Sequence, residues 1–212
     1  MRDLEIRGAG DILGRRQHGH ISAVGFDLYT RLLAQAVCEL KGEADGHLLS
    51  EDIAYLMPLR EAMQISLPIP VSLPADYVAD DELRLRLYRR MAGLARMSEI
   101  DELAAELTDR FGPLPPPAAN LIYQLRLKVL GTAAGVQSLS ADDRRLVLRV
   151  EGLEKQNRAA VQARLRGVVP GVIVGRRQIW LPMADEERIW RAELIGLLRS
   201  LQAYTNSVDF IP

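Results

Sequence analysis

Apolar residues recur every three or four positions over much of this 212-residue chain, which is the spacing of one buried face of an amphipathic helix. The spacing predicts a helix over residues 26–41 and three consecutive helices between about residues 80 and 130. Ser98 and Asp101 predict a capping box at the start of the second of these three helices. Two more helices are predicted, near residues 154–166 and at the C-terminal end. The predicted buried positions of the three consecutive helices and of the C-terminal helix are Leu83, Leu87, Met91, Leu94, Leu103, Leu107, Phe111, Ala118, Leu121, Ile122, Leu125, Val129, Trp190, Leu194, Leu197, Leu198 and Leu201.

Alternation at every second position predicts β-strands in the last third of the chain. Residues 145–150 alternate leucine or valine with arginine, as expected for a strand with one exposed face. The segments 171–174 and 177–182 predict a hairpin around Gly175. Residues 63–74 alternate apolar residues with prolines and predict an edge strand or an extended arm, because proline cannot donate to a sheet ladder. Helices come first and strands later, so the sequence predicts a helix-rich α+β fold with a small mixed or antiparallel sheet.

The chain divides by pattern into three regions. Residues 1–41 combine a glycine-rich, charged loop with the first predicted helix. Residues 42–61 carry scattered glycines and acids with weak periodicity, which predicts a linker. Residues 62–212 form the predicted compact domain. Met1 runs directly into motif-like sequence, so we expect the chain to be a piece of a longer protein.

Composition narrows the class of protein without naming it. The chain is 48% hydrophobic and 26% charged, which is ordinary for a globular protein. Its formal net charge is −1, so any contact with nucleic acid must come from a local patch. Cys38 is the single cysteine, which excludes a disulfide within the chain and fits a reducing cytoplasm. The sequence contains no apolar run long enough to predict a membrane span or a signal peptide. We therefore expect a cytoplasmic protein with no membrane partner.

The N-terminal loop raises the question of a nucleotide site. Gly8, Gly10 and Gly14 approach a dinucleotide-binding fingerprint, which needs a preceding strand, a following helix and an acid about 20 residues further on. Only three residues of strand-like sequence precede these glycines, and the nearest acid, Asp27, lies on the predicted helix. A tight, irregular turn with positive φ is the favoured interpretation, and a dinucleotide-binding domain is kept as an alternative.

The usual signatures of catalysis and metal binding are missing from the sequence. There is no phosphate-binding loop of the GxxxxGK[ST] type, no GxSxG and no HExxH. His18 and His20 lie close together in the loop, but a protein metal site usually needs three or four ligands and the only other histidine is His47, so no metal site is expected. Cys38 lies within a predicted helix with no evident base, which indicates a buried structural thiol.

Three arginines offer a further alternative. Arg144, Arg145 and Arg149 on the predicted strand could contact the phosphates of a nucleic acid. Acidic residues flank them, among them Asp142 and Glu151, so a solvated strand face is the favoured interpretation.

Beyond these patterns, residues 2–19, RDLEIRGAGDILGRRQHG, resemble the TRG segment shared by the RecG branch-migration helicase and the transcription-repair coupling factor (Mfd) family. The matching positions are Asp3, Leu4, Arg7, Gly8, Gly10, Leu13, Gly14, Gln17 and Gly19. Residues 19–37 resemble the coupling factors more than RecG. Residues 73–94 and 106–128 are similar to the C-terminal domain peculiar to the coupling factors. A RecG-like helicase fragment is kept as the alternative.

The resemblance implies a role for the N-terminal region in a DNA motor. In the family, two RecA-like lobes outside this chain bind and hydrolyse ATP with magnesium, and the TRG segment couples their movement to stepping along double-stranded DNA. Arg7 and Gln17 match its functional polar positions, while Gly8, Gly10 and Gly14 shape the sharp loop. His18 stands where the family usually has serine. We therefore expect no catalysis and no cofactor in this chain alone, and ATP-dependent DNA translocation in the parent protein.

The resemblance also implies a regulatory role for residues 62–212. In the family this domain docks on the protein's own N-terminal module, which recruits the damage-recognition protein UvrA, and masks it until the motor engages stalled RNA polymerase. The family's docking residues correspond to Glu106, Asp109 and Arg110. Positions i, i+3 and i+4 share one helix face, so helical geometry agrees. The alternative is a solvated charged face whose local ion pairs contribute little.

Overall fold

The structure, a computed structural model, describes residues 63–207. The predicted TRG loop, the helix over 26–41 and the linker lie outside the described residues, so the division into three regions stays a prediction. The described elements, in chain order, are β1 (Gln64–Ser66), α4 (Asp81–Ala92), α5 (Met97–Phe111), α6 (Pro116–Ala133), β2 (Val136–Asp142), β3 (Arg145–Val150), the 3₁₀ turn η3 (Leu153–Lys155), α7 (Arg158–Arg166), β4 (Ile173–Val174), β5 (Gln178–Pro182) and α8 (Glu187–Thr205). The predicted helix-rich α+β fold is confirmed.

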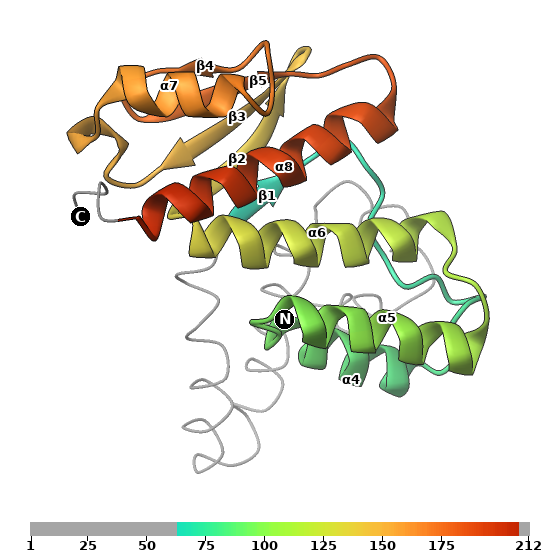
Figure 1. The fold of residues 1–212 in the computed structure, drawn as a ribbon. Helices are drawn as coiled ribbons and strands as arrows, with labels where there is room; N and C mark the ends of the chain where they lie inside the picture. The colour runs from blue at the N-terminus through green and yellow to red at the C-terminus, as the bar shows by residue number, and fades with distance from the viewer. Residues whose placement is uncertain (1–62, 208–212) are drawn as a thin grey trace, which may run out of the picture.

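The elements stack in layers that separate the sheet from the first two helices. Figure 1 shows, from top to bottom, the sheet with α7, then α8, then α6, and finally α5 and α4. Helices α6 and α8 pack side by side, and α6 also reaches β1 and β2. The two central helices therefore join the strand-rich part of the domain to its helical end.

The sheet has five strands in the order β1-β2-β3-β5-β4. β1 pairs in parallel with β2 at one edge, and the other neighbours are antiparallel. The predicted edge strand, the predicted strand over 145–150 and the hairpin around Gly175 are all confirmed. Along β3, Leu146, Leu148 and Val150 are buried, as the alternation predicts.

The alternation of apolar residues did not predict β2, because this strand contains a β-bulge. Its register against β3 shifts between Val136 and Ser138. The two buried residues of the strand, Val136 and Leu139, are consequently three positions apart instead of two or four. That spacing hides a strand from a search for strict alternation.

The helix predicted near 154–166 begins later than its pattern suggests. Residues Leu153–Lys155 form the 3₁₀ turn, and α7 starts at Arg158. Asn157 sets this start, because its side-chain oxygen accepts hydrogen bonds from the backbone N–H groups of Ala159 and Ala160.

The predicted capping box of Ser98 and Asp101 is wrong. Helix α5 begins at Met97 with Arg96 as its N-cap, and Ser98 is exposed in the first turn. The Glu99 carboxylate instead reaches back to accept from the backbone N–H groups of Ala95 and Arg96, at 3.0 Å each. The Arg96 guanidinium also donates to Glu99. Only half of a capping box is present, because Glu99 accepts from the N-cap backbone while the Arg96 side chain has no acceptor for the backbone N–H of Glu99. An arginine at the N-cap conceals this arrangement from a sequence search.

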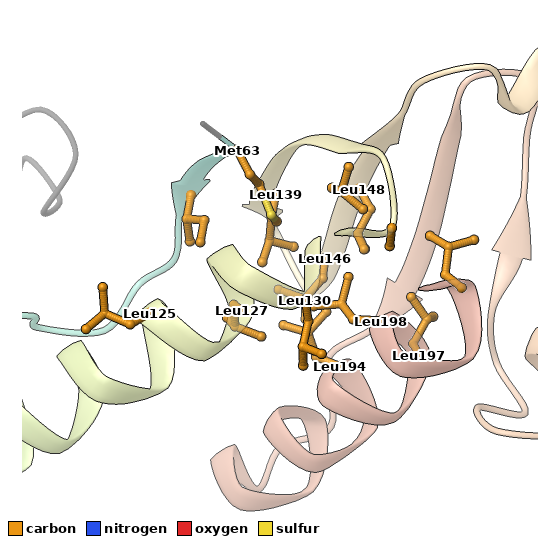
Figure 2. Close-up of a cluster of buried hydrophobic side chains, with 14 of the residues drawn as sticks. Met63, Leu125, Leu127, Leu130, Leu139, Leu146, Leu148, Leu194, Leu197 and Leu198 are labelled. Atoms are coloured by element: carbon orange, nitrogen blue, oxygen red, sulfur yellow. The ribbon is translucent and has the colours of Figure 1, made fainter. Parts of the chain in front are cut away.

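The core is continuous from the sheet to the helical end. Figure 2 shows Leu127 and Leu130 of α6 meeting the leucines of α8, with Leu146 of β3 behind them. Leu127, Leu146 and Leu194 of α8 are fully buried. The pattern identified the buried face of α8 correctly, from Trp190 to Leu201.

A polar cluster ties α6, α8 and the segment after β1 together at one side of this core. Asn120 of α6 donates to the carbonyl of Pro70 at 2.8 Å and accepts from Arg191 of α8 at 2.7 Å. The Arg191 guanidinium lies 4.9 Å from the ring centre of Tyr123, whose hydroxyl donates to the Arg191 carbonyl. Burial raises the pKa of Tyr123, so this hydroxyl stays protonated as a donor.

Shortening a central leucine tests whether the α6–α8 layer holds the domain together. Leu194→Ala removes a fully buried side chain and leaves a cavity, so we expect the free energy of unfolding to fall by about 2–5 kcal/mol. Urea unfolding measures the change. The matched control is Leu85→Ala on α4, at a position that is only half-buried, and an equal loss in both variants would contradict the account.

The start of α5 can be tested by comparing two neighbouring positions. Glu99→Ala leaves the N–H groups of Ala95 and Arg96 without their acceptor, and we expect the thermal midpoint to fall. Ser98→Ala removes an exposed hydroxyl and should leave the midpoint unchanged or slightly raised, because alanine is the better helix former. The reverse ranking would restore Ser98 as the cap.

Candidate functional site

The three predicted docking residues lie together near the C-terminal end of α5. Leu103 and Leu107 of the same helix are fully buried, so the helix turns Glu106, Asp109 and Arg110 away from the core. Asp109 and Arg110 are exposed and the Glu106 side chain is 30% exposed. The structure therefore brings these residues onto one accessible face, while their role in docking stays a prediction.

Glu106 is the centre of a charged network that joins two helices. Its Oε2 accepts a hydrogen bond from Arg90 of α4 at 2.5 Å, and its Oε1 accepts from Arg110 at 3.0 Å. Hydrogen bonding to Arg90, reinforced by Arg110, lowers the pKa of the Glu106 carboxyl from its usual 4.5. Glu106 is thus held ionised and in one orientation between two guanidinium groups.

A small aromatic cluster supports the same end of α5. The Arg110 guanidinium lies 5.1 Å from the centre of the Phe111 ring, which meets Tyr77 edge to face at 5.7 Å. The Tyr77 hydroxyl lies 2.9 Å from the carbonyl oxygens of both Leu107 and Gly112. These contacts anchor the last turn of α5, where Gly112 ends the helix with φ +86°.

Asp109 differs from its two neighbours in this group. It is exposed, and no hydrogen bond or ion pair links its carboxylate to another residue within 63–207. The face therefore presents a carboxylate open to a partner beside a carboxylate already bridged by arginines. This contrast could not be read from the spacing of the three residues.

Arg90 is the member of the site that sequence reasoning missed. It lies on α4, sixteen residues before Glu106, and its side chain is 48% exposed. No helical spacing connects the two positions, because the contact depends on how α4 and α5 pack. The only sequence signal was the excess of cations in the last turn of α4, where arginine also complements the helix dipole.

Most of the remaining predicted site residues belong to the N-terminal part of the chain. Arg7, Gly8, Gly10, Gly14 and Gln17 lie outside the described residues, as do the three histidines and Cys38. Their predicted roles stay predictions.

The three arginines of the alternative phosphate site lie within the described part of the chain. Arg144 pairs with Asp185. Arg145 and Arg149 are exposed on β3 and point to the face of the sheet opposite the core. The structure thus separates one paired arginine from two accessible ones.

Two features are absent from the described residues. Across residues 63–207, no group of three or more histidine, cysteine, aspartate or glutamate side chains is arranged to hold a metal ion. None of the helices in that range is long and apolar enough to cross a membrane.

Comparison with known proteins agrees with the fold and with the predicted family resemblance. Residues 67–161 match the TRCF domain family. The chain is 39% identical over 210 residues to a transcription-repair-coupling factor of Mycobacterium bovis, a match that covers 95% of this chain and 16% of the relative. A transcription-repair-coupling factor of Escherichia coli is 37% identical over 142 residues, covering 67% of this chain and 12% of the relative.

A solved structure gives the same fold. The crystal structure of the C-terminal domain of a transcription-repair coupling factor superposes with a TM-score of 0.60, covering 70% of this chain and 99% of that one, at 19% sequence identity. The described residues are thus a helix-rich α+β domain with the fold of that C-terminal domain. On the sequence matches, the chain belongs to the transcription-repair coupling factor family.

The charged network predicts a specific dependence of stability on pH. Glu106→Gln removes the charge from two partly exposed ion pairs, each worth about 0.2–1 kcal/mol. Because folding lowers the pKa of Glu106, its contribution is complete above the usual value of 4.5 and is lost as the pH falls through the lowered value.

The measurement is urea unfolding of the wild type and the variant at pH 7 and at pH 3. We expect the wild type to be the more stable at pH 7 and the difference to shrink at pH 3. Glu102→Gln, at an exposed position one turn earlier on α5, is the control and should show no such difference. A pH-independent effect of Glu106→Gln would contradict the ion-pair account.

Proposed function

We propose that this chain is the C-terminal part of a transcription-repair coupling factor and works as a regulatory and coupling element without catalysis of its own. The parent would be an ATP-dependent translocase on double-stranded DNA that removes stalled RNA polymerase and recruits UvrA for nucleotide excision repair. Support comes from the TRCF domain match and from relatives similar over 95% of the chain. The TRCF domain match also favours the coupling factors over a RecG-like helicase. The chain spans 16% of the length of the Mycobacterium relative, so the ATPase lobes, ATP and magnesium belong to the rest of the parent in this proposal.

Residues 63–207 supply the regulatory function in this proposal, by docking on the UvrA-recruiting module of the same protein. The observation that carries it is the arrangement of Glu106, Asp109 and Arg110 on one accessible face of a rigid helix end. A surface that must bind and release a partner benefits from such pre-organisation, because fewer side chains have to be ordered on docking.

The charges of this face suit a reversible contact. Partly exposed ion pairs such as those of Glu106 contribute little to folding, so exchanging Arg90 or Arg110 for a partner's group costs little. Complementary charges across an interface set specificity and the rate of association more than raw affinity. Asp109, with no partner among the described residues, is the position most open to a cationic group of the docked module.

Residues 1–41 supply the coupling function in the proposal. Arg7 and Gln17 would transmit movement of the RecA-like lobes to the DNA, and Gly8, Gly10 and Gly14 would allow the sharp loop that this needs. The match to the Mycobacterium relative covers 95% of the chain and so includes most of this region.

The docking proposal is tested by titrating the chain with the N-terminal UvrA-recruiting module of a coupling factor, followed by calorimetry. The variant Glu106→Ala/Asp109→Ala/Arg110→Ala should bind at least about tenfold more weakly, since charged contacts of this kind are each worth about 1 kcal/mol or more once desolvated. The control is Arg144→Ala/Asp185→Ala, which removes an exposed ion pair at the other end of the molecule. Circular dichroism verifies that every variant is folded.

Each outcome tests a different part of the docking proposal. Loss of binding in the triple variant alone supports docking through α5. Equal binding by the triple variant and the wild type would contradict the assignment of these residues. If the separate parts do not bind at all, the same variants are compared within one continuous chain, where tethering raises the effective concentration of the partner. Docking that is still absent there would overturn the proposal.

A further inference from the structure

One face of the sheet has no described element packed on it. The inward-facing residues of the strands, such as Leu139, Leu146 and Ile179, are buried against the helices. On the opposite face, no residue of the five strands is buried, from Gln64 of β1 to Ile173 of β4. We call this the outer sheet face. It lies at the far end of the layers from α5 and α4 (Figure 1), and so is separate from the docking residues.

An apolar stripe crosses the outer sheet face over three neighbouring strands. Val147 of β3 lies opposite Trp180 of β5, and Trp180 lies opposite Ile173 of β4. Val147 and Trp180 are half-buried, and Ile173 is 51% exposed. Trp180 lies on β5, next to the edge strand β4, and a partly open tryptophan is unusual for a surface that only meets water, because its ring carries a large apolar area.

Two arginines flank this stripe. Arg145 and Arg149 lie two residues before and after Val147, so their side chains leave β3 on the same side as its own. Both are exposed, and no ion pair joins either of them to another residue of 63–207. Asp142, opposite Arg145 at the rim, is the single acidic residue on this face of the five strands.

The strand-rich part of the chain is basic although the whole chain is not. Residues 136–182 contain nine arginine or lysine residues and four aspartate or glutamate residues. Two of the arginines, Arg176 and Arg177, are exposed in the turn between β4 and β5, where Arg177 pairs with Glu154. The overall charge of −1 therefore hides a local excess of cations, of which four lie in the 3₁₀ turn and α7 and the others on or beside the strands.

Gly175 fixes the position of the Trp180 ring. A Cβ atom added at Gly175 would lie 2.5 Å from the indole atom Cζ3 and 2.6 Å from Cη2. No other residue can occupy this position unless the ring moves, so the glycine lets the indole lie close against the β4–β5 turn. The indole is thus packed against the β4–β5 turn, on the strand next to the one that carries the two arginines.

We propose that the outer sheet face binds single-stranded nucleic acid, with a base stacked on Trp180 and phosphates paired with Arg145 and Arg149. An aromatic side chain on an open sheet with flanking cations is a recurring way to bind unpaired strands, since each base offers a π face and each linkage a charge. A duplex keeps its bases stacked on one another and cannot use the indole in this way. An acidic peptide would use the arginines and leave the indole without a stacking partner.

The test is fluorescence anisotropy of a labelled oligothymidylate of about 15 nucleotides, a length that matches the site size of compact binding folds. The full chain is titrated at several salt concentrations. Trp180→Ala should weaken binding by about fivefold or more, because it removes the stacking of one base, while Trp180→Phe should retain most of it. Arg145→Ala/Arg149→Ala should weaken binding and reduce the dependence of affinity on salt.

The control is Arg158→Ala/Arg166→Ala, which removes the same number of charges from exposed positions on α7. It should bind as the wild type does. Thermal unfolding verifies that each variant is folded. If Trp180→Ala does not fold, the comparison between Trp180→Phe and the arginine variants still tests the proposal. The proposal is overturned if the wild type does not bind the oligonucleotide at low salt. It is equally overturned if both arginine pairs weaken binding alike, or if an acidic peptide binds more tightly than the oligonucleotide.

Discussion

The packing of α6 and α8 against each other on the helix-covered side of the sheet is the interaction on which the rest of the domain depends. The sheet by itself buries one face only, and α4 and α5 form a separate helical layer that is connected to the sheet through α6. Fully buried leucines on all three elements close this layer, and the bonds of Asn120 to Pro70 and Arg191 fix its register. A close-packed interior is hardly compressible, so the helical end with α4 and α5 and the sheet at the other end keep fixed positions relative to each other.

The layered arrangement leaves two separate surfaces exposed, one at each end of the layers. At the helical end, Glu106, Asp109 and Arg110 form a face of mixed charge on a rigid helix terminus. At the other end, the outer sheet face combines Trp180 with Arg145 and Arg149, which form no ion pair with any described residue. Because the core separates the two surfaces, the two proposed partners would not compete for the same residues.

The sequence predicted the elements whose pattern is regular and the helix face shared by Glu106, Asp109 and Arg110. The alternation of 145–150 and the apolar stripe from Trp190 to Leu201 both survive in the structure, because burial enforces their periods. β2 escaped prediction because a bulge breaks its alternation, and the cap of α5 because Arg96 is an uncommon N-cap residue. Arg90 could not be found at all, because its bond to Glu106 joins two helices and depends on tertiary packing.

The central claim is that the C-terminal end of α5 is a docking face for another module of a coupling factor. Hydrogen–deuterium exchange of the chain, with and without the UvrA-recruiting module, tests it most directly by locating the buried backbone. The account predicts slower exchange around residues 106–112 and at the end of α4, with the outer sheet face unchanged. Slower exchange confined to β3 and β5, with α5 unaffected, would contradict it.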